Sequence, residues 1–359
     1  MKVPNNFTPG PSQLYFTVED HMRKAFREGI PSLSHRSKQF EQIFRDTTEG
    51  LRQLLAIPSD HCIVFASSAT EIWERIIQNL TQESSYHFVN GAFSQRFYET
   101  AIQLGRKANK TETEEGKGFS STSADAAPEL IALTQNETST GVSLPQDFIN
   151  DFRSQHPQAI IAVDAVSSLP YPAFDFKKVD TVFFSVQKGF GLPAGLGVWI
   201  VNEACISKSE SLHAKGLSIG SYHSLPGLVA HAKKYQTPET PNVLGIYLLG
   251  QVIQDMLRKG ITALRKETEY KATVLYQTLE QHQLIKPFVT EKQLRSQTVI
   301  VAETGSHTKA IAEFLMRKGL SPGDGYGKHK GDQLRFANFP AHSKELYELL
   351  MDLLLEFTG

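Results

Sequence analysis

Cysteine, net charge and long apolar runs are all scarce in this sequence, and each scarcity removes a class of protein. Only Cys62 and Cys205 occur in 359 residues, so a disulfide-stapled scaffold is excluded and a reducing compartment is expected. The net charge of −1 provides no basic face for nucleic acid. The first residues lack the apolar core of a secretory signal, and no apolar run approaches the length of a membrane span. We therefore expect a cytoplasmic globular protein that binds neither nucleic acid nor membranes.

One central stretch combines a buried pattern with a lysine. Residues 181–201, TVFFSVQKGFGLPAGLGVWIV, predict a strand, a turn rich in glycine and proline, and a second strand, with Lys188 just past the first strand. A lysine at the rim of a core loses its charge readily and can form a Schiff base with a carbonyl cofactor. Its position alone also fits an ordinary surface lysine. The glycines loosely match a dinucleotide fingerprint, but a strand follows where that motif requires a helix, so we reject it.

A second buried strand, residues 159–168, carries one carboxylate, Asp164. An acidic side chain among isoleucines and valines is costly unless a cation or hydrogen-bond donors face it. A protonated pyridine nitrogen would be such a partner. A helix cap or a paired arginine would satisfy the carboxylate equally well.

The aspartate strand followed by SVQKGFGLPAGLG resembles the pyridoxal phosphate (PLP) site of the class V aminotransferases. Further segments resemble the phosphoserine aminotransferase branch and occur in its order along nearly the whole chain: TPGPSQL, SHRSKQF, QNETSTG, QTPET and GYGKHKGDQLRFANFP. The resemblance implies an α/β protein of PLP-dependent transferase fold type I. In that fold a large domain with a mainly parallel sheet is joined to a smaller C-terminal α+β domain. We place an N-terminal segment near the active site at residues 1–16, the large domain at 17–258 and the small domain at 259–359.

The resemblance also implies roles for individual residues. Lys188 would hold PLP and carry the proton, and Asp164 would keep the pyridine nitrogen protonated. The other implied cofactor contacts are a helix start for the phosphate, an aromatic ring against the cofactor, hydrogen-bonding side chains and a threonine reaching a partner subunit's cofactor. These are Ser68, Ala69, Thr70, Phe93, Thr138, Gln187 and Thr237. The resemblance implies no metal.

The substrate side is expected to be basic. Arg335, an arginine within an apolar strand, suits bidentate capture of the α-carboxylate. The other implied substrate ligands are His35, Arg36, Lys328 and His329. The implied substrates are small amino acids and 2-oxo acids, and the implied assembly is a homodimer with shared active sites.

The expected reaction is that of serine biosynthesis, in which glutamate and 3-phosphohydroxypyruvate give 2-oxoglutarate and phosphoserine. Two departures from the branch keep an alanine–glyoxylate or serine–glyoxylate aminotransferase open as the alternative. Glu71 stands where the branch has arginine, and Lys328 with His329 replaces a His-Arg pair. A binding protein on the same scaffold, without PLP, is the alternative from another class.

Three local expectations concern the large domain. Residues 107–127 are polar and are interpreted as a surface excursion, to which we assign no function. Phe93 is placed on a turn between a strand and a helix. Thr17 and Asp20 loosely match a capping box that would begin a helix.

Overall fold

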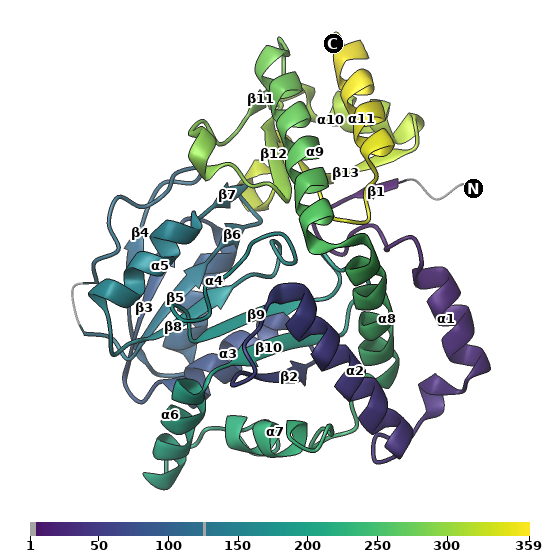
Figure 1. Cartoon of the computed structure of the whole chain (residues 1–359). Coiled ribbons are helices and arrows are strands. Elements are labelled where there is room, and N and C mark those ends of the chain that lie inside the picture. Colours follow the sequence, from purple (N-terminus) through teal and green to yellow (C-terminus); the bar gives the residue numbers. More distant parts are fainter. Residues whose placement is uncertain (1–4, 125–126) are drawn as a thin grey trace.

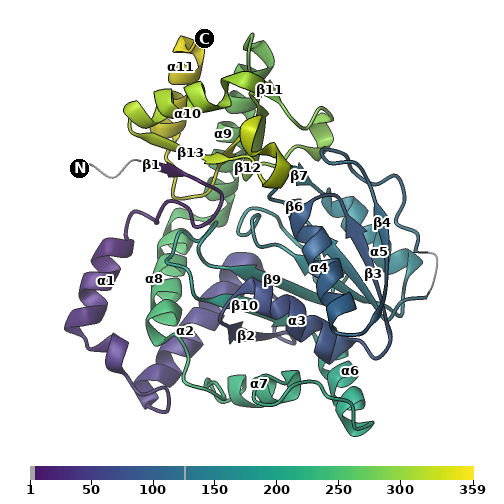
Figure 2. The ribbon, with the colours of Figure 1, turned by 180° about the vertical axis from the view of Figure 1, so that it is seen from behind.

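The computed structural model describes residues 5–124 and 127–359. Two sheets organise these residues, a seven-stranded sheet and a five-stranded sheet that lies above it in Figure 1. Helix α5 lies on the face of the large sheet turned to the viewer in Figure 1, whereas α3 and α4 lie on the opposite face, seen in Figure 2. The structure is therefore layered α/β in its larger part.

The large sheet has the strand order β2-β10-β9-β8-β5-β3-β4. Among the strands described, β10 runs antiparallel to both of its neighbours, whereas β9, β8, β5, β3 and β4 pair in parallel. The expected mainly parallel sheet is confirmed. The bounds are β2 Cys62–Ala66, β3 Ser84–Val89, β4 Lys107–Glu112, β5 Leu130–Thr134, β8 Ile160–Asp164, β9 Thr181–Ser185 and β10 Gly197–Val201.

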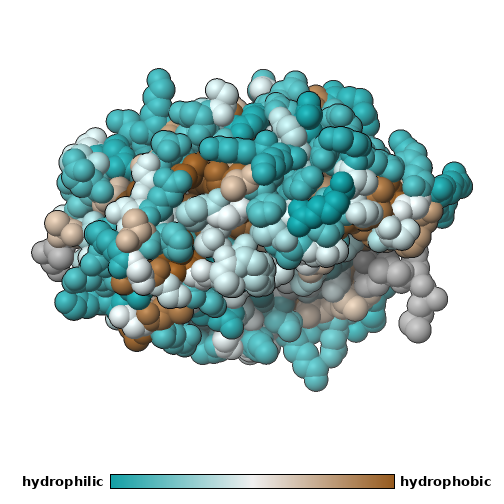
Figure 3. Space-filling view, turned by 90° about the horizontal axis from the view of Figure 1, so that it is seen from below, coloured by the Kyte–Doolittle hydropathy of each residue, from teal (hydrophilic) through white to brown (hydrophobic). Residues whose placement is uncertain are grey.

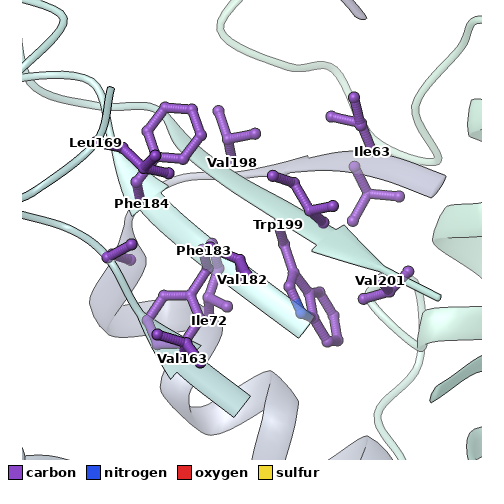
Figure 4. Close-up of a cluster of buried hydrophobic side chains, with 14 of the residues drawn as sticks. Ile63, Ile72, Val163, Leu169, Val182, Phe183, Phe184, Val198, Trp199 and Val201 are labelled. Atoms are coloured by element: carbon purple, nitrogen blue, oxygen red, sulfur yellow. The ribbon is translucent and has the colours of Figure 1, made fainter. Parts of the chain in front are cut away.

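The middle strands are buried along their whole length because helices cover both faces of the sheet. Phe183 and Ile72 lie on one side of β9, and Phe184 and Leu169 lie on the other (Figure 4). Parallel strands bring their carboxyl ends to the same edge, where ligands bind in such sheets. The end of β8 and the turn after β9 therefore meet there.

Eight helices in the described residues belong to the large sheet and its surroundings. They are α1 Val18–Arg27, α2 Lys38–Leu55, α3 Ala69–Leu80, α4 Ala92–Gln103, α5 Gln146–Gln155, α6 Glu203–Ala214, α7 Leu225–Ala232 and α8 Val243–Lys259. A small hairpin, β6 Asn136–Glu137 and β7 Val142–Ser143, follows β5. Helices α2 and α8 pack closely, since the Thr47 hydroxyl donates to the Ile246 carbonyl at 3.1 Å.

The small sheet has the order β1-β13-β14-β12-β11 and a separate apolar core. Its elements are β1 Asn5–Phe7, α9 Ile261–Gln281, β11 Lys286–Pro287, β12 Val299–Glu303, α10 Thr308–Arg317, β13 Leu320–Asp324, β14 Gln333–Ala337 and α11 Lys344–Glu356. Short 3-10 helices occur at Ile30–Ser32, Lys292–Leu294, Gly305–His307 and Gly327–Gly331. Strand β1 pairs in parallel with β13, so the N-terminal segment joins the small sheet before it reaches the large one.

Two local expectations are wrong, and one strand was not expected. The polar stretch at residues 107–112 is strand β4, which pairs with β3 at the sheet edge, where a strand needs no apolar side chains on its exposed face. Phe93 is the second residue of helix α4 rather than part of a turn. The Thr17 hydroxyl does not cap α1, because it donates to Asp255 Oδ2 at 2.5 Å.

The surface seen from below is mainly hydrophilic with separate apolar areas, some of them in a hollow (Figure 3). Exposed apolar side chains in the connection between α6 and α7 include Leu217 and Tyr222. Across residues 5–124 and 127–359, no helix carries an apolar stretch that could reach from one side of a bilayer to the other.

Candidate active site

Lys188 lies in the turn after β9 and is 7% exposed. Its Nζ donates to the Thr138 hydroxyl at 3.4 Å and lies 5.3 Å from the centroid of the Phe93 ring. Burial lowers the pKa of this amine to about 8, with a further lowering by Arg335, while Asp164 and Glu137 act to raise it. With this pKa, the amine is neutral in a fraction of the molecules near physiological pH, and a nucleophile or proton carrier must be neutral.

The N-terminal segment from Thr8 to Tyr15, called the strap below, crosses this lysine. The Ser12 N–H donates to the Gln187 carbonyl at 3.0 Å, and the Tyr15 N–H donates to the Gly191 carbonyl at 2.7 Å. A Cβ on Gly10 would lie 2.9 Å from Lys188 Cε and would crowd that flexible side chain, and the φ of +141° is a backbone conformation that favours glycine. The strap therefore covers the lysine side chain.

Asp164 ends β8 and is 3% exposed. Its carboxylate accepts hydrogen bonds from Trp73 Nε1 and from the Val166 N–H, each at 2.9 Å. Burial raises its pKa to about 6 although both hydrogen bonds and Lys188 act to lower it. Because both donors are neutral, the carboxylate is arranged to gain from a cationic ligand atom beside it.

Arg335 of β14, in the small sheet, contacts the same hairpin residue as Lys188, Thr138. Its Nε donates to the Asp324 carbonyl at 2.6 Å, and its Nη1 donates to the Thr138 carbonyl at 3.2 Å. The guanidinium carbon lies 5.4 Å from the centroid of the Tyr326 ring, which in turn lies 5.1 Å from the Phe93 ring. Burial lowers the pKa of Arg335, but the ordinary pKa of a guanidinium is so high that the side chain stays cationic. Arg335 is thus placed to bind a carboxylate near Lys188.

The start of α3 is the predicted phosphate position. Ser68 is the N-cap and accepts from the Glu71 N–H at 3.1 Å, while the Ala69 N–H donates to the Ser185 hydroxyl at 2.8 Å. Glu71 accepts the Ser67 N–H at 2.9 Å and pairs with Arg75 at 2.9 Å. The negative charge of Glu71 is therefore offset within the helix. The Thr70 side chain is exposed.

His35, Arg36 and Thr237 form a second group. Arg36 donates to the Gln236 side chain at 3.0 Å, to the Thr237 carbonyl at 2.8 Å and to the Pro238 carbonyl at 3.2 Å. The Thr237 hydroxyl donates to the Glu239 carbonyl at 2.7 Å. Within residues 5–124 and 127–359, no hydrogen bond links this group to Lys188. Arg36 thus holds residues 236–238 in place.

Lys328 and His329 lie in the 3-10 helix Gly327–Gly331 and are paired with acids. Lys328 Nζ and His329 Nε2 both contact Glu115 Oε2, at 2.9 and 2.8 Å, and His329 Nδ1 lies 3.2 Å from Asp332 Oδ1. Burial acts to raise the pKa of Glu115, but the hydrogen bonds from the two basic side chains lower it overall. A phosphate bound here would have to share these two basic side chains with Glu115.

The sequence predictions missed four residues that the structure adds to this region. Gly10 and Ser12 belong to a quoted motif, TPGPSQL, and Tyr326 belongs to GYGKHKG, so the signal was present but was not assigned to individual residues. The Ser12 hydroxyl is buried and has no hydrogen-bond partner in the part of the chain that the structure describes. The fourth, Glu137, directly precedes Thr138 and is fully buried.

Comparison with known proteins gives one consistent family. The family model described as class V aminotransferase matches residues 5–326. The crystal structure of a phosphoserine aminotransferase from Cytophaga hutchinsonii is 50% identical, covers 100% of both chains and superimposes with a TM-score of 0.98.

More distant relatives extend the comparison. The phosphoserine aminotransferase of a Nocardioides species is 26% identical over 347 residues, which cover 95% of this chain and 92% of that protein. The alanine–glyoxylate aminotransferase from a Nostoc species is 20% identical and covers 99% of this chain and 95% of that one, with a TM-score of 0.84. The last likeness concerns the fold alone.

Proposed function

This chain belongs to the class V aminotransferases, and from that premise we propose that it is a phosphoserine aminotransferase. The proposed reaction moves the amino group of glutamate to 3-phosphohydroxypyruvate and yields 2-oxoglutarate and phosphoserine. The chain is a PLP-dependent transaminase with the α/β fold of that enzyme class, as predicted. The 50% identity over the full length of a phosphoserine aminotransferase carries the choice of substrate.

The residues around Lys188 fit PLP. The amine is buried with a lowered pKa, a hydroxyl and an aromatic ring adjoin it, and Asp164 is a buried acid whose two donors are neutral. Bound PLP supplies an electron sink for the carbanion formed at the substrate Cα. We assign the aldehyde to Lys188 and the pyridine N–H to Asp164, where a carboxylate holds a cationic nitrogen.

The remaining roles follow from position. Phe93 would lie against the cofactor ring, and Thr138 and Gln187 would donate to its polar groups. Ser68, Ala69 and Thr70 would hold the phosphate at the start of α3, where backbone N–H groups and the helix dipole favour anions. Arg335 would bind the α-carboxylate, and the free amine of Lys188 would take the proton from Cα and return it.

We propose that the active enzyme is a homodimer. Arg36 is fixed to residues 236–238, so His35, Arg36 and Thr237 form one unit that a second copy can offer to a neighbouring site. His35, Arg36, Lys328 and His329 would then bind the substrate phosphate, with Lys328 and His329 leaving Glu115. The free Cys62 and Cys205 favour a reducing compartment, and we place the enzyme in the cytoplasm.

Single-turnover reactions of the PLP-loaded enzyme test the substrate. We expect phosphoserine and glutamate each to discharge the visible absorption band in the half-reaction. Alanine and serine should be slower by roughly a hundredfold, because they have no second anionic group to pair with the basic side chains of the site. A protein that does not react with phosphoserine but reacts rapidly with alanine or serine would instead be an alanine–glyoxylate or serine–glyoxylate aminotransferase. A protein that takes up no PLP and stays colourless would be a binding protein.

A further inference from the structure

Glu137 is a fully buried carboxylate that the roles assigned above do not use. It ends β6, and its side chain is 0% exposed. At the next residue, Thr138, the carbonyl accepts from Arg335 Nη1 and the hydroxyl accepts from the Lys188 amine. A charge buried this deeply needs several donors, and their origin shows what the carboxylate does.

Five donors point at Glu137, and three of them come from helix α4. Oε1 accepts from the Phe93 N–H at 3.3 Å, from the Ser139 N–H at 3.1 Å and from the Ser139 hydroxyl at 2.6 Å. Oε2 accepts from the Ser94 N–H and the Ser94 hydroxyl, each at 2.9 Å. The carboxylate is thus the anion at the N-terminus of α4, where the helix dipole favours it. A glutamine would turn its NH2 group toward at least one backbone N–H.

Gly91 supplies the space for this contact. A Cβ on Gly91 would lie 2.5 Å from Glu137 Cγ and 2.6 Å from Ser139 Oγ. The φ of Gly91, 170°, is ordinary extended backbone, so lack of space is the reason for glycine here. The Ser139 hydroxyl also accepts from the Ala92 N–H at 3.0 Å. The first turn of α4 is therefore clamped to the turn between β6 and β7.

The clamp joins the two groups that flank the reactive amine. Phe93 lies on the helix side of Lys188 and Thr138 on the hairpin side, at 5.3 Å and 3.4 Å from Nζ. We propose that Glu137 is a positioning residue, which fixes the Phe93 ring against Thr138 and Lys188 so that the cofactor ring is held in one orientation. This role rests on the proposed function, because it presupposes PLP on Lys188.

Glu137 also adds negative charge to the surroundings of the amine. The charged groups facing Lys188 are Asp164, Glu137 and Arg335, of which the two acids raise the pKa of the amine and Arg335 lowers it. Loss of the Glu137 charge should therefore make the amine deprotonate at lower pH. Two variants separate the loss of charge from the loss of contact: glutamine removes the charge and also faces a backbone N–H with its NH2 group, whereas aspartate keeps the charge with a shorter reach.

The experiment compares Glu137→Gln and Glu137→Asp with the wild type and with Glu129→Gln. Glu129 is a matched control, because its carboxylate also binds three backbone N–H groups, those of residues 82–84, at the opposite end of β3. Three quantities are measured: the half-reaction rate with glutamate, the visible circular dichroism of bound PLP, and the pH midpoint of PLP uptake by the apoprotein.

We expect Glu137→Gln to lower the half-reaction rate roughly tenfold or more, because misplacement of the reacting groups is costly. It should also weaken the visible circular dichroism and move the uptake midpoint down by roughly half a pH unit. Glu137→Asp should lower the rate and the dichroism while its midpoint stays at the wild-type value. Glu129→Gln should change none of the three, even where it lowers the melting temperature.

The inference is overturned if Glu137→Gln matches Glu129→Gln in rate and dichroism. It is also overturned if the aspartate variant keeps the wild-type rate, because reach would then be unimportant. Should the glutamine variant fail to fold, the aspartate comparison decides alone. A wild-type protein that takes up no PLP would overturn the proposed function itself, which is a separate result.

Discussion

Lys188 and Lys271 are both buried lysines, and their surroundings differ in the way that separates a reactive group from a structural one. Lys271 of α9 is 1% exposed, and its amine donates to the Phe339 carbonyl at 3.1 Å and the His342 carbonyl at 2.7 Å. Lys188 makes one longer hydrogen bond, to Thr138 at 3.4 Å. Burial lowers the pKa of both amines, to about 7 for Lys271 and to about 8 for Lys188. A lowered pKa alone therefore does not distinguish Lys188, the proposed reactive lysine, from Lys271; the weaker hydrogen bonding of Lys188 and the buried Asp164 that faces it do.

The strongest test of this contrast is to remove each lysine in turn. Lys188→Ala should abolish the visible PLP band and lower transamination by roughly 10⁴-fold or more, since both the attachment point and the proton carrier are lost. Lys271→Met should keep the band and stay within about threefold of the wild-type kcat.

In the wild type, the lowered pKa of Lys271 makes the free energy of unfolding rise with pH between about 7 and the pKa of an unfolded lysine. Denaturant unfolding at several pH values should show this slope reduced in Lys271→Met, and a colourless Lys271→Met protein would break the comparison.

Removal of the buried acid that faces Lys188, Asp164, tests the same contrast and should have a smaller effect on the rate. Asp164→Asn should lower kcat roughly 10²- to 10³-fold, because the pyridine nitrogen loses its charged partner.

The raised pKa of Asp164 means that the carboxyl group stays protonated in the folded apoprotein up to about pH 6. The contribution of Asp164 to stability therefore falls as pH rises from about 4 to 6. Two pKa units correspond to roughly 3 kcal/mol, an upper bound for the gain of the variant over the wild type between pH 4 and pH 8. Urea unfolding of both apoproteins measures it, and parallel curves would contradict the burial of this charge.

Gly10 should show the smallest of these effects. A methyl group in Gly10→Ala would push against Lys188 Cε, and the flexible side chain can move aside. We expect kcat to fall roughly tenfold because the amine is displaced. Gly216→Ala is the matched control, since Gly216 also has a positive φ, of 77°, and a Cβ there would meet nothing within 4 Å. Equal kcat in the two variants would show that crowding of the lysine at Gly10 does not affect the reaction.

The parts of the fold that could be predicted from the sequence are those whose burial leaves a mark on composition. Strands β8, β9 and β10 are apolar runs, so the sheet and the relation of Asp164 to Lys188 followed from pattern and family resemblance. Strand β4 was missed because its sequence, KANKTE, is polar, and only pairing with β3 makes it a strand.

The rest of the site depends on contacts between segments that are distant in sequence. The motif QNETSTG was noticed for Thr138, yet nothing in it shows that Glu137 would bind the start of α4. The sequence likewise does not show that Glu115 pairs with Lys328 and His329. The roles proposed for these residues stay predictions until the variants are measured.

The parallel pairing of β1 with β13 has a consequence for how the protein is made. The Asn6 carbonyl accepts from His342, a residue 336 positions later, so strand β1, which directly precedes the strap, is held by segments that the ribosome produces last. The other end of the strap binds the carbonyls of Gln187 and Gly191, which are synthesised much earlier. The two ends of the strap are therefore anchored at different stages of synthesis, and a product that lacks β13 would keep only the anchor beside Lys188.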